Sequence, residues 1–125
     1  MSGEIEYLKH IKDETEFLIK SSEHIAFDEF VKNEVLKRAW VRSLEIIGEA
    51  VKKINLQFRE KYPEVKWKEI AGTRDKLIHD YMGVDYEIVW DIVKNEIPVL
   101  DQQIKEILQK ESENRAVKDD KCGEK

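Results

Sequence analysis

The chain has 125 residues, of which 41% are hydrophobic and 39% charged, and its formal net charge is −5. This length predicts one domain with a buried core, because single domains commonly hold about 100–200 residues. Glycine and proline are scarce, with five and two residues, which favours long amphipathic helices and argues against a β-sandwich or barrel.

The sequence also limits where the protein acts. Its single cysteine, Cys122, lies in a polar C-terminal segment, so no intramolecular disulfide can form, and no Cys/His grouping has zinc-finger spacing. The N-terminus has no long apolar run, and no stretch approaches the roughly 20 apolar residues that span a bilayer. We therefore expect a soluble cytoplasmic protein without membrane association.

The charge is distributed unevenly along the chain. Residues 1–36 carry nine acids and four bases, residues 37–79 six acids and eleven bases, and residues 80–125 twelve acids and seven bases. The middle segment thus has a local net charge of +5. A phosphate ligand would respond to this local field, because salt confines electrostatic interactions to roughly 8–10 Å. The alternative is that these lysines and arginines only solvate helix faces.

Residues 4–24 have an apolar stripe with helical spacing. Its members lie three, four or seven residues apart, with acids and lysines between them: Ile5, Leu8, Ile11, Thr15, Leu18 and Ile25. This period predicts an amphipathic first helix.

A second, longer helical pattern follows. Asp28 is a good N-cap for it, and apolar residues keep the helical period to about Phe58. Tyr62-Pro63 ends the pattern, because a proline pushes the residue before it out of the helical conformation. The pattern covers roughly 30 residues, so we expect a break or kink, with Gly48 as the first candidate. Gly48 could instead mark a point where two helices approach closely.

The second half of the chain predicts further helices. One starts at Trp67 and ends near Gly83, where glycine can adopt the left-handed backbone conformation. Asp85 is the expected N-cap of the next helix. Pro98 must kink that helix or begin a new one, because proline has no N–H. Residues 111–125 are almost all charged or small, and we expect a frayed or disordered tail.

Helices with one apolar stripe each, joined by short loops, indicate an all-α fold. We predict an antiparallel bundle of four to five helices over residues 1–110, followed by the charged tail. The tryptophans Trp40, Trp67 and Trp90 should pack in the core or at an interface, and each buried indole N–H needs an acceptor.

One segment, residues 67–81, brings together side chains suited to chemistry on a phosphate. Arg74 has forked donors that match phosphate oxygens, and His79 can exchange a proton near neutral pH. These two groups could cleave RNA without a metal or any other cofactor. A base removes the proton of the 2′-OH, which attacks the adjacent phosphorus, while the guanidinium stabilises the charge that develops on the phosphoryl oxygens.

The spacing of Arg74 and His79 constrains such a site. On a regular helix they lie about 140° apart around the axis and roughly 7.5 Å apart along it, so one straight helix cannot direct both at one phosphate. The helix could unwind near His79, or two copies could face each other across a two-fold axis, which we favour because it doubles the positive charge. Asp75, one turn before His79, could orient the imidazole, or form only a surface pair. Glu49, within an apolar stretch, should form an ion pair or lie at the rim of the dimer cleft.

The segment resembles the Arg-x4-His-x-Tyr signature of HepT-like proteins, a family of the HEPN superfamily. Arg74, His79 and Tyr81 occupy the three motif positions. The resemblance runs in family order over about residues 4–108 and includes further features: Ile46-Ile47-Gly48-Glu49-Ala50, Tyr62-Pro63, Trp67, Ile70-Ala71-Gly72-x-Arg74-Asp75, Gly83-Val84-Asp85, Trp90 and Pro98. This extent makes the match much more specific than the short motif.

The resemblance implies a function, a partner and a subunit arrangement. HepT-like proteins form homodimers with the RNase site in an interface cleft, and they act as toxins of type VII toxin–antitoxin modules. Their antitoxin is a minimal nucleotidyltransferase of the MntA type, which transfers AMP onto the motif tyrosine and silences the toxin. By position, Arg74 and His79 become the catalytic pair with Asp75 in support, and Tyr81 becomes the AMP acceptor.

Two other functions remain open from the sequence. HEPN-like bundles also serve as non-catalytic companions of nucleotidyltransferases that bind a nucleotide or a substrate, and the acidic flanks of the chain would suit a basic partner. A helical dimerisation adaptor without chemistry is the third possibility. It leaves the grouping of Arg74, His79 and Tyr81 unexplained.

Overall fold

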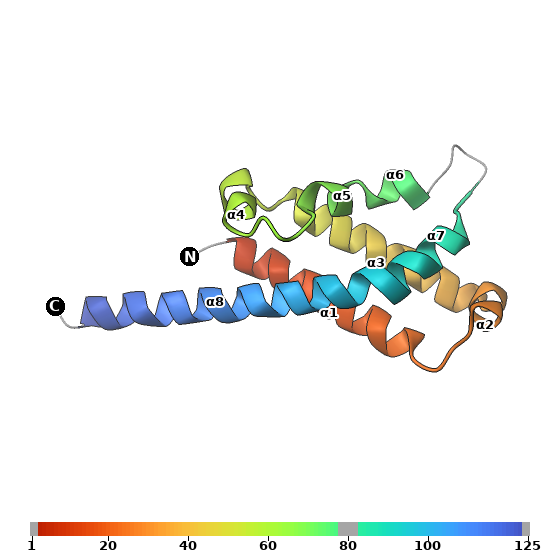
Figure 1. Ribbon diagram of the computed structural model, residues 1–125, viewed down its shortest axis with the longest axis horizontal. Coiled ribbons are helices and arrows are strands. Elements are labelled where there is room, and N and C mark those ends of the chain that lie inside the picture. Colours follow the sequence, from red (N-terminus) through yellow and green to blue (C-terminus); the bar gives the residue numbers. More distant parts are fainter. Residues whose placement is uncertain (1–2, 78–82, 124–125) are drawn as a thin grey trace.

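The computed structural model describes residues 3–77 and 83–123, with side chains up to Arg115. This part of the chain is all-α, as the sequence predicts (Figure 1). In chain order the elements are α1 (Gly3–Ser22), α2 (Phe27–Lys32), α3 (Glu34–Lys52), α4 (Leu56–Lys61), α5 (Trp67–Ala71), α6 (Thr73–Leu77), α7 (Tyr86–Asp91), the π-helical turn η2 (Ile92–Glu96) and α8 (Ile97–Gly123).

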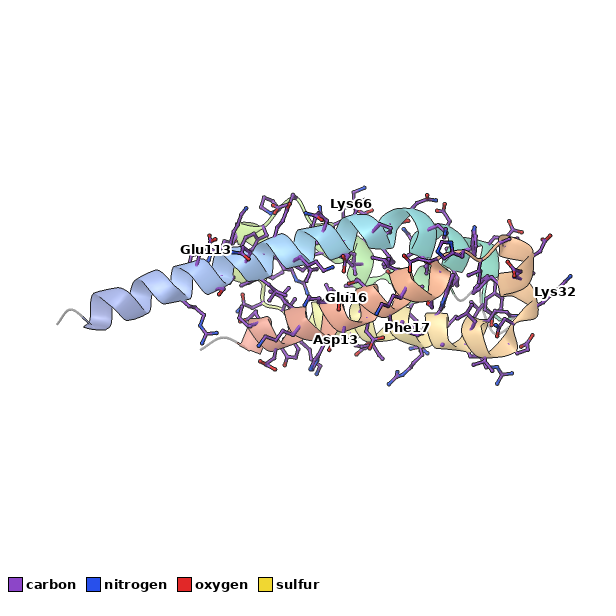
Figure 2. All side chains as sticks on the ribbon, turned by 90° about the horizontal axis from the view of Figure 1, so that it is seen from below. Asp13, Glu16, Phe17, Lys32, Lys66 and Glu113 are labelled. Carbon is purple, nitrogen blue, oxygen red and sulfur yellow. The ribbon has the colours of Figure 1, made fainter. Side chains whose placement is uncertain are left out.

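The helices run back and forth in an antiparallel bundle (Figure 1). Helix α3 returns along α1, the short helices α5 and α6 run back along α3, and α7, η2 and α8 return as one nearly continuous helix. Figure 1 and Figure 2 both show α1 and α8 side by side. The predicted bundle of four to five helices is therefore confirmed, with its third member divided in two.

The core forms where the apolar stripes of these helices meet. Its largest fully buried side chains come from α1, α2, α3, α6, α7, α8 and the turn after α3: Leu8, Ile11, Leu18, Phe30, Trp40, Ile47, Val51, Ile54, Leu77, Val89, Ile104 and Ile107. Burial of each such side chain stabilises the fold by about 1.5–3 kcal/mol. Because each stripe covers one side of its helix, no described helix is apolar enough over sufficient length to cross a membrane.

The long helix predicted from Asp28 is broken early, at Asn33. Asn33 ends α2 and caps α3, since its side-chain oxygen accepts a hydrogen bond from the Leu36 N–H at 2.9 Å. The short polar side chain of asparagine competes for backbone donors and so favours such a break. The prediction that Asp28 is an N-cap is wrong; that position in α2 belongs to Ala26, whose N–H donates to Glu29 at 2.9 Å.

The same pattern ends as a helix at Lys52, six residues before the predicted end. A second asparagine, Asn55, caps α4 by accepting from the Phe58 N–H at 2.8 Å. The Arg59 side chain then folds back and donates to the carbonyl of Val51 at 2.7 Å. The guanidinium is thus a second donor to a carbonyl at the end of α3, which also accepts from the Ile54 N–H at 3.0 Å.

The tryptophans pack as the sequence predicts. Trp40 is fully buried, and its indole N–H donates to the Ser21 hydroxyl at 2.9 Å. Trp67 is buried at the start of α5, and its indole N–H donates to the Tyr62 carbonyl at 2.9 Å. Trp90 is half-buried and stacks on Trp40 with ring centroids 5.9 Å apart. Burying indole rings is favourable only when their N–H groups are bonded, and here both buried indoles are.

The predicted cap in the last third of the chain is present, and the helix changes from π to α just before Pro98. Asp85 caps α7 by accepting from the N–H groups of Glu87 and Ile88 at 3.1 and 3.2 Å. The widened π-helical turn η2 lies directly before α8, in which Pro98 is the second residue. Since proline has no N–H and its ring crowds the carbonyl four residues earlier, a local widening of the helix accommodates it.

Helix α8 extends further than the sequence pattern predicts. Its backbone is helical to Gly123 and projects beyond the other helices, past Glu113 (Figure 2), whereas the pattern predicts a frayed or disordered tail from residue 111. Good helix formers in this stretch, among them Glu, Lys, Arg and Ala, favour local helix. Glu111 still touches the bundle, because it accepts a hydrogen bond from the Tyr62 hydroxyl. Burial and this bond raise the pKa of Tyr62. The boundary at residue 110 stays a prediction.

A buried polar contact ties α1 to α8. The Thr15 hydroxyl donates to the Asp101 carboxylate at 2.8 Å, and both residues are buried among the apolar stripes. Lys105 lies 2.8 Å from the second Asp101 oxygen, and this bond raises the pKa of Lys105. A buried carboxylate is tolerated because both of its oxygens have partners.

Replacing Thr15 with valine should lower the free energy of unfolding by about 1–3 kcal/mol, because Asp101 loses a buried donor while the side-chain volume hardly changes. Urea unfolding followed by circular dichroism measures this. Gln102→Ala, on the exposed side of α8, is the matched control and should cost less than about 0.5 kcal/mol. Equal losses in the two variants would contradict a stabilising role for the Thr15–Asp101 bond.

Candidate functional site

Helix α3 comes very close to α5 at Gly48. A Cβ atom at this position would lie 3.4 Å from the Ile70 carbonyl oxygen and 3.7 Å from that of Ala71. The second interpretation of Gly48 is therefore confirmed: it marks a close approach of two helices, and α3 is unbroken there. The absence of a side chain lets the backbones of α3 and α5 meet.

The helix predicted from Trp67 to Gly83 is divided at Gly72. Helix α5 ends at Ala71, and α6 begins at Thr73. The Gly72 N–H donates to the Lys68 carbonyl at 3.1 Å, and the Gly72 carbonyl accepts from the Asp75 N–H at 3.1 Å. Glycine is the weakest helix former after proline, so the chain changes direction there at little cost. The break directs α6, which carries Arg74, along α3.

Arg74 lies on α6 with its side chain largely exposed, at 66%. Its Nε atom is 3.6 Å from a carboxylate oxygen of Glu45, on α3, whose side chain is only 28% exposed. The partly buried carboxylate thus pairs with a guanidinium that stays accessible to solvent. Analysis of the sequence missed Glu45, because its pairing with Arg74 depends on how α3 and α6 pack.

These residues line a shallow hollow of about 270 Å³ between the two helices, which we call the α3–α6 depression. Its lining consists of Arg42, Leu44, Glu45, Gly48, Glu49, Lys52, Ala71 and Arg74. A separate hollow of about 390 Å³ lies between α3, α5, α6 and the start of α8, but it does not include Arg74. The α3–α6 depression is thus the candidate site, because it contains the motif arginine.

The outcomes for the other predicted site residues differ. Asp75 is exposed on α6, and its expected partner, His79, lies outside the described residues, as does Tyr81. Leu77 is buried just before that segment, and its carbonyl accepts from the Asp85 N–H at 2.8 Å. Leu77, the last described residue before that segment, is therefore packed in the core and bonded to Asp85.

Two further expectations concern Glu49 and Gly83. Glu49 lies 3.4 Å from Lys52, one turn later on α3, with its side chain 62% exposed, so it forms a surface ion pair and not a buried structural one. Gly83 has a φ of +125°, a backbone conformation that favours glycine. Among the described residues, no group of three or more His, Cys, Asp or Glu side chains could hold a metal ion.

Comparison with known proteins decides the family. The chain matches the family model described as "Ribonuclease HepT-like" over residues 5–107. It belongs to the HepT-like family. Arg74, His79 and Tyr81 all lie within the matched region, so the resemblance that these residues carry is confirmed. No solved structure matches the chain significantly.

The relatives of this HepT-like chain come from bacteria and archaea. It is 62% identical over 105 residues to a "Putative RNase" of Caldanaerobacter subterraneus subsp. tengcongensis, covering 84% of this chain and 94% of that protein. A "Putative RNase" of Methanocaldococcus jannaschii is 46% identical over 82% of this chain and 84% of its own length. The "Probable ribonuclease HepT" of Thermococcus cleftensis is 42% identical, covering 76% and 86%.

Substitutions at Gly48 test the close approach that positions Glu45 beside Arg74. Gly48→Ala should change the free energy of unfolding by less than about 1 kcal/mol, because better helix propensity offsets a tight contact with the Ile70 carbonyl. Gly48→Val adds branches at that contact and should cost about 1–3 kcal/mol. Urea unfolding measures both. A valine variant as stable as the alanine variant would show that the contact does not limit residue 48.

Proposed function

We propose that this HepT-like chain is a metal-independent endoribonuclease and the toxin of a toxin–antitoxin module. The observation that carries the proposal is the exposed guanidinium of Arg74, which pairs with Glu45 in a depression that also contains Arg42 and Lys52. The family of this chain is described as ribonucleases. A concave surface with several cations suits an RNA backbone.

The proposed reaction uses the nucleophile that RNA itself carries. His79 accepts the proton of the 2′-OH, and the 2′ oxygen attacks the adjacent phosphorus. The bond from phosphorus to the 5′ oxygen breaks, and the leaving oxygen takes up a proton, so that a 2′,3′-cyclic phosphate and a 5′-OH remain. Arg74 stabilises the negative charge on the phosphoryl oxygens, and Asp75 supports His79 by accepting from its ring N–H.

A homodimer completes the proposed site. Two copies related by a two-fold axis would place both Arg74 and both His79 side chains around one cleft. This arrangement resolves the difficulty that a single regular helix cannot direct Arg74 and His79 at the same phosphate. The RNA strand would then lie between the subunits, in a field set by the basic segment of each.

Regulation by a minimal nucleotidyltransferase antitoxin is part of the proposal. The phenolic oxygen of Tyr81 would attack the α-phosphorus of ATP, with pyrophosphate as the leaving group. The transferred AMP adds bulk and negative charge two residues from His79. It would occupy the place of the RNA and repel its backbone, so the toxin would be silenced.

Arg74→Ala and His79→Ala should each reduce RNA cleavage by about 10³-fold or more, because each removes a group that acts in the transition state. Cleavage of a labelled single-stranded RNA by purified protein measures this. Arg115→Ala, an exposed arginine on α8, is the matched control and should cleave normally. Wild-type protein that cuts no RNA, or variants that cut like the wild type, would contradict the proposal.

Co-expression with a minimal nucleotidyltransferase of the MntA type should add one or more AMP masses to the protein and abolish its RNase activity. Tyr81→Phe should prevent the addition, because phenylalanine lacks the accepting oxygen. Intact mass spectrometry measures the addition. Tyr7→Phe, which changes a half-buried tyrosine of α1, is the control and should be modified like the wild type. AMP added equally to the Tyr81→Phe variant would rule out Tyr81 as the acceptor.

A further inference from the structure

The face of α3 beside Arg74 carries an ordered set of charges. Three of them follow Arg42 by three, seven and ten residues, namely Glu45, Glu49 and Lys52. This spacing places all four on one side of the helix. All four line the α3–α6 depression together with Arg74. The lining therefore holds three cations and two carboxylates.

Two of the three cations that line the depression form ion pairs with its carboxylates. Glu45 pairs with Arg74 at 3.6 Å, and Glu49 pairs with Lys52 at 3.4 Å. Arg42 is exposed and forms no ion pair within the part of the chain that the structure describes. Its guanidinium is thus available to an anion that enters the depression.

We infer that Arg42 binds a second phosphate of the RNA strand, adjacent to the phosphate that Arg74 contacts. This inference rests on the proposed ribonuclease function and adds a substrate subsite to it. Arg42 lies three residues before Glu45 on α3, and the α3–α6 depression that it lines is also lined by Arg74 from α6. A strand with one negative charge per nucleotide can occupy both, since each guanidinium fork matches two phosphate oxygens.

Arg38 separates this inference from the simpler view that the cations of α3 only solvate its surface. Arg38 lies one turn before Arg42 on the same helix and is exposed like it, but it does not line the depression. General solvation of the helix predicts equal, small effects on RNA binding at the two positions. A subsite predicts a large effect at Arg42 alone.

The binding experiment uses full-length protein and a short 2′-O-methyl RNA, which lacks the attacking hydroxyl and stays intact. Arg42→Ala should weaken binding about tenfold, as expected when a charge-assisted hydrogen bond is removed. It should also lower the dependence of log K on log salt by about 0.7 for each phosphate that the variant no longer binds. Arg38→Ala should bind like the wild type, and Arg42→Lys should be intermediate, because it keeps the charge but not the fork.

Steady-state cleavage of the corresponding RNA gives a second readout. Arg42→Ala should raise KM about tenfold with little change in kcat, because Arg42 would bind its phosphate equally in the bound substrate and in the transition state. Circular dichroism should show that all variants keep their helix content.

The possible results separate the subsite from the proposed function. If Arg42→Ala and Arg38→Ala have equal effects on binding and its salt dependence, the subsite is wrong even where the wild type cleaves RNA. If the wild type cleaves no RNA but binds the 2′-O-methyl strand in an Arg42-dependent way, the subsite is supported and the proposed ribonuclease function is wrong. Wild-type protein that does not bind the strand would overturn the subsite as well.

Discussion

The close approach of α3 and α5 at Gly48 is the contact on which the candidate site depends. Because residue 48 has no side chain, the carbonyl oxygens of Ile70 and Ala71 lie within 3.4 and 3.7 Å of where a Cβ would be. This contact keeps α6, which follows directly, beside the exposed face of α3. Glu45 and Arg74 can therefore form an ion pair although they lie 29 residues apart in the chain. A branched residue at position 48 would crowd the carbonyls of Ile70 and Ala71 and push α5 away from α3.

Local charge matters more than total charge in this protein. The chain as a whole is acidic, with a formal net charge of −5. The described part of its basic segment, residues 37–77, nevertheless folds back on itself through α3, α4, α5 and α6. This fold brings Arg42 and Lys52 of α3 next to Arg74 of α6 in one depression. Glu45 and Glu49 each neutralise one cation without removing the positive balance, so the surface can attract a phosphate while the folded chain avoids strong internal repulsion.

Sequence patterns within a few residues predicted where most helices lie. They did not predict where the helices break, because that depends partly on tertiary contacts. The apolar stripes, the Asp85 cap and the distortion near Pro98 follow from local geometry and hydrogen bonding, and all are present. The helix breaks were placed wrongly because several residues compete for such roles. Asn33 rather than Asp28 provides the cap that begins α3, and Gly72 rather than Gly48 interrupts a helix. A glycine on a contact face and a glycine at a break look alike in a sequence.

The sequence by itself determined the fold class, the family and the motif residues Arg74, His79 and Tyr81. Helical periodicity, capping and motif order depend only on residues that are close together in the chain. Only the tertiary structure showed that Glu45 forms an ion pair with Arg74 and that Arg42 lines the same depression. These relations depend on the distance and rotation between α3 and α6. Side-chain packing and the backbone contact at Gly48 set this distance and rotation. They involve residues far apart in the chain, so the periodicity of the sequence does not reveal them.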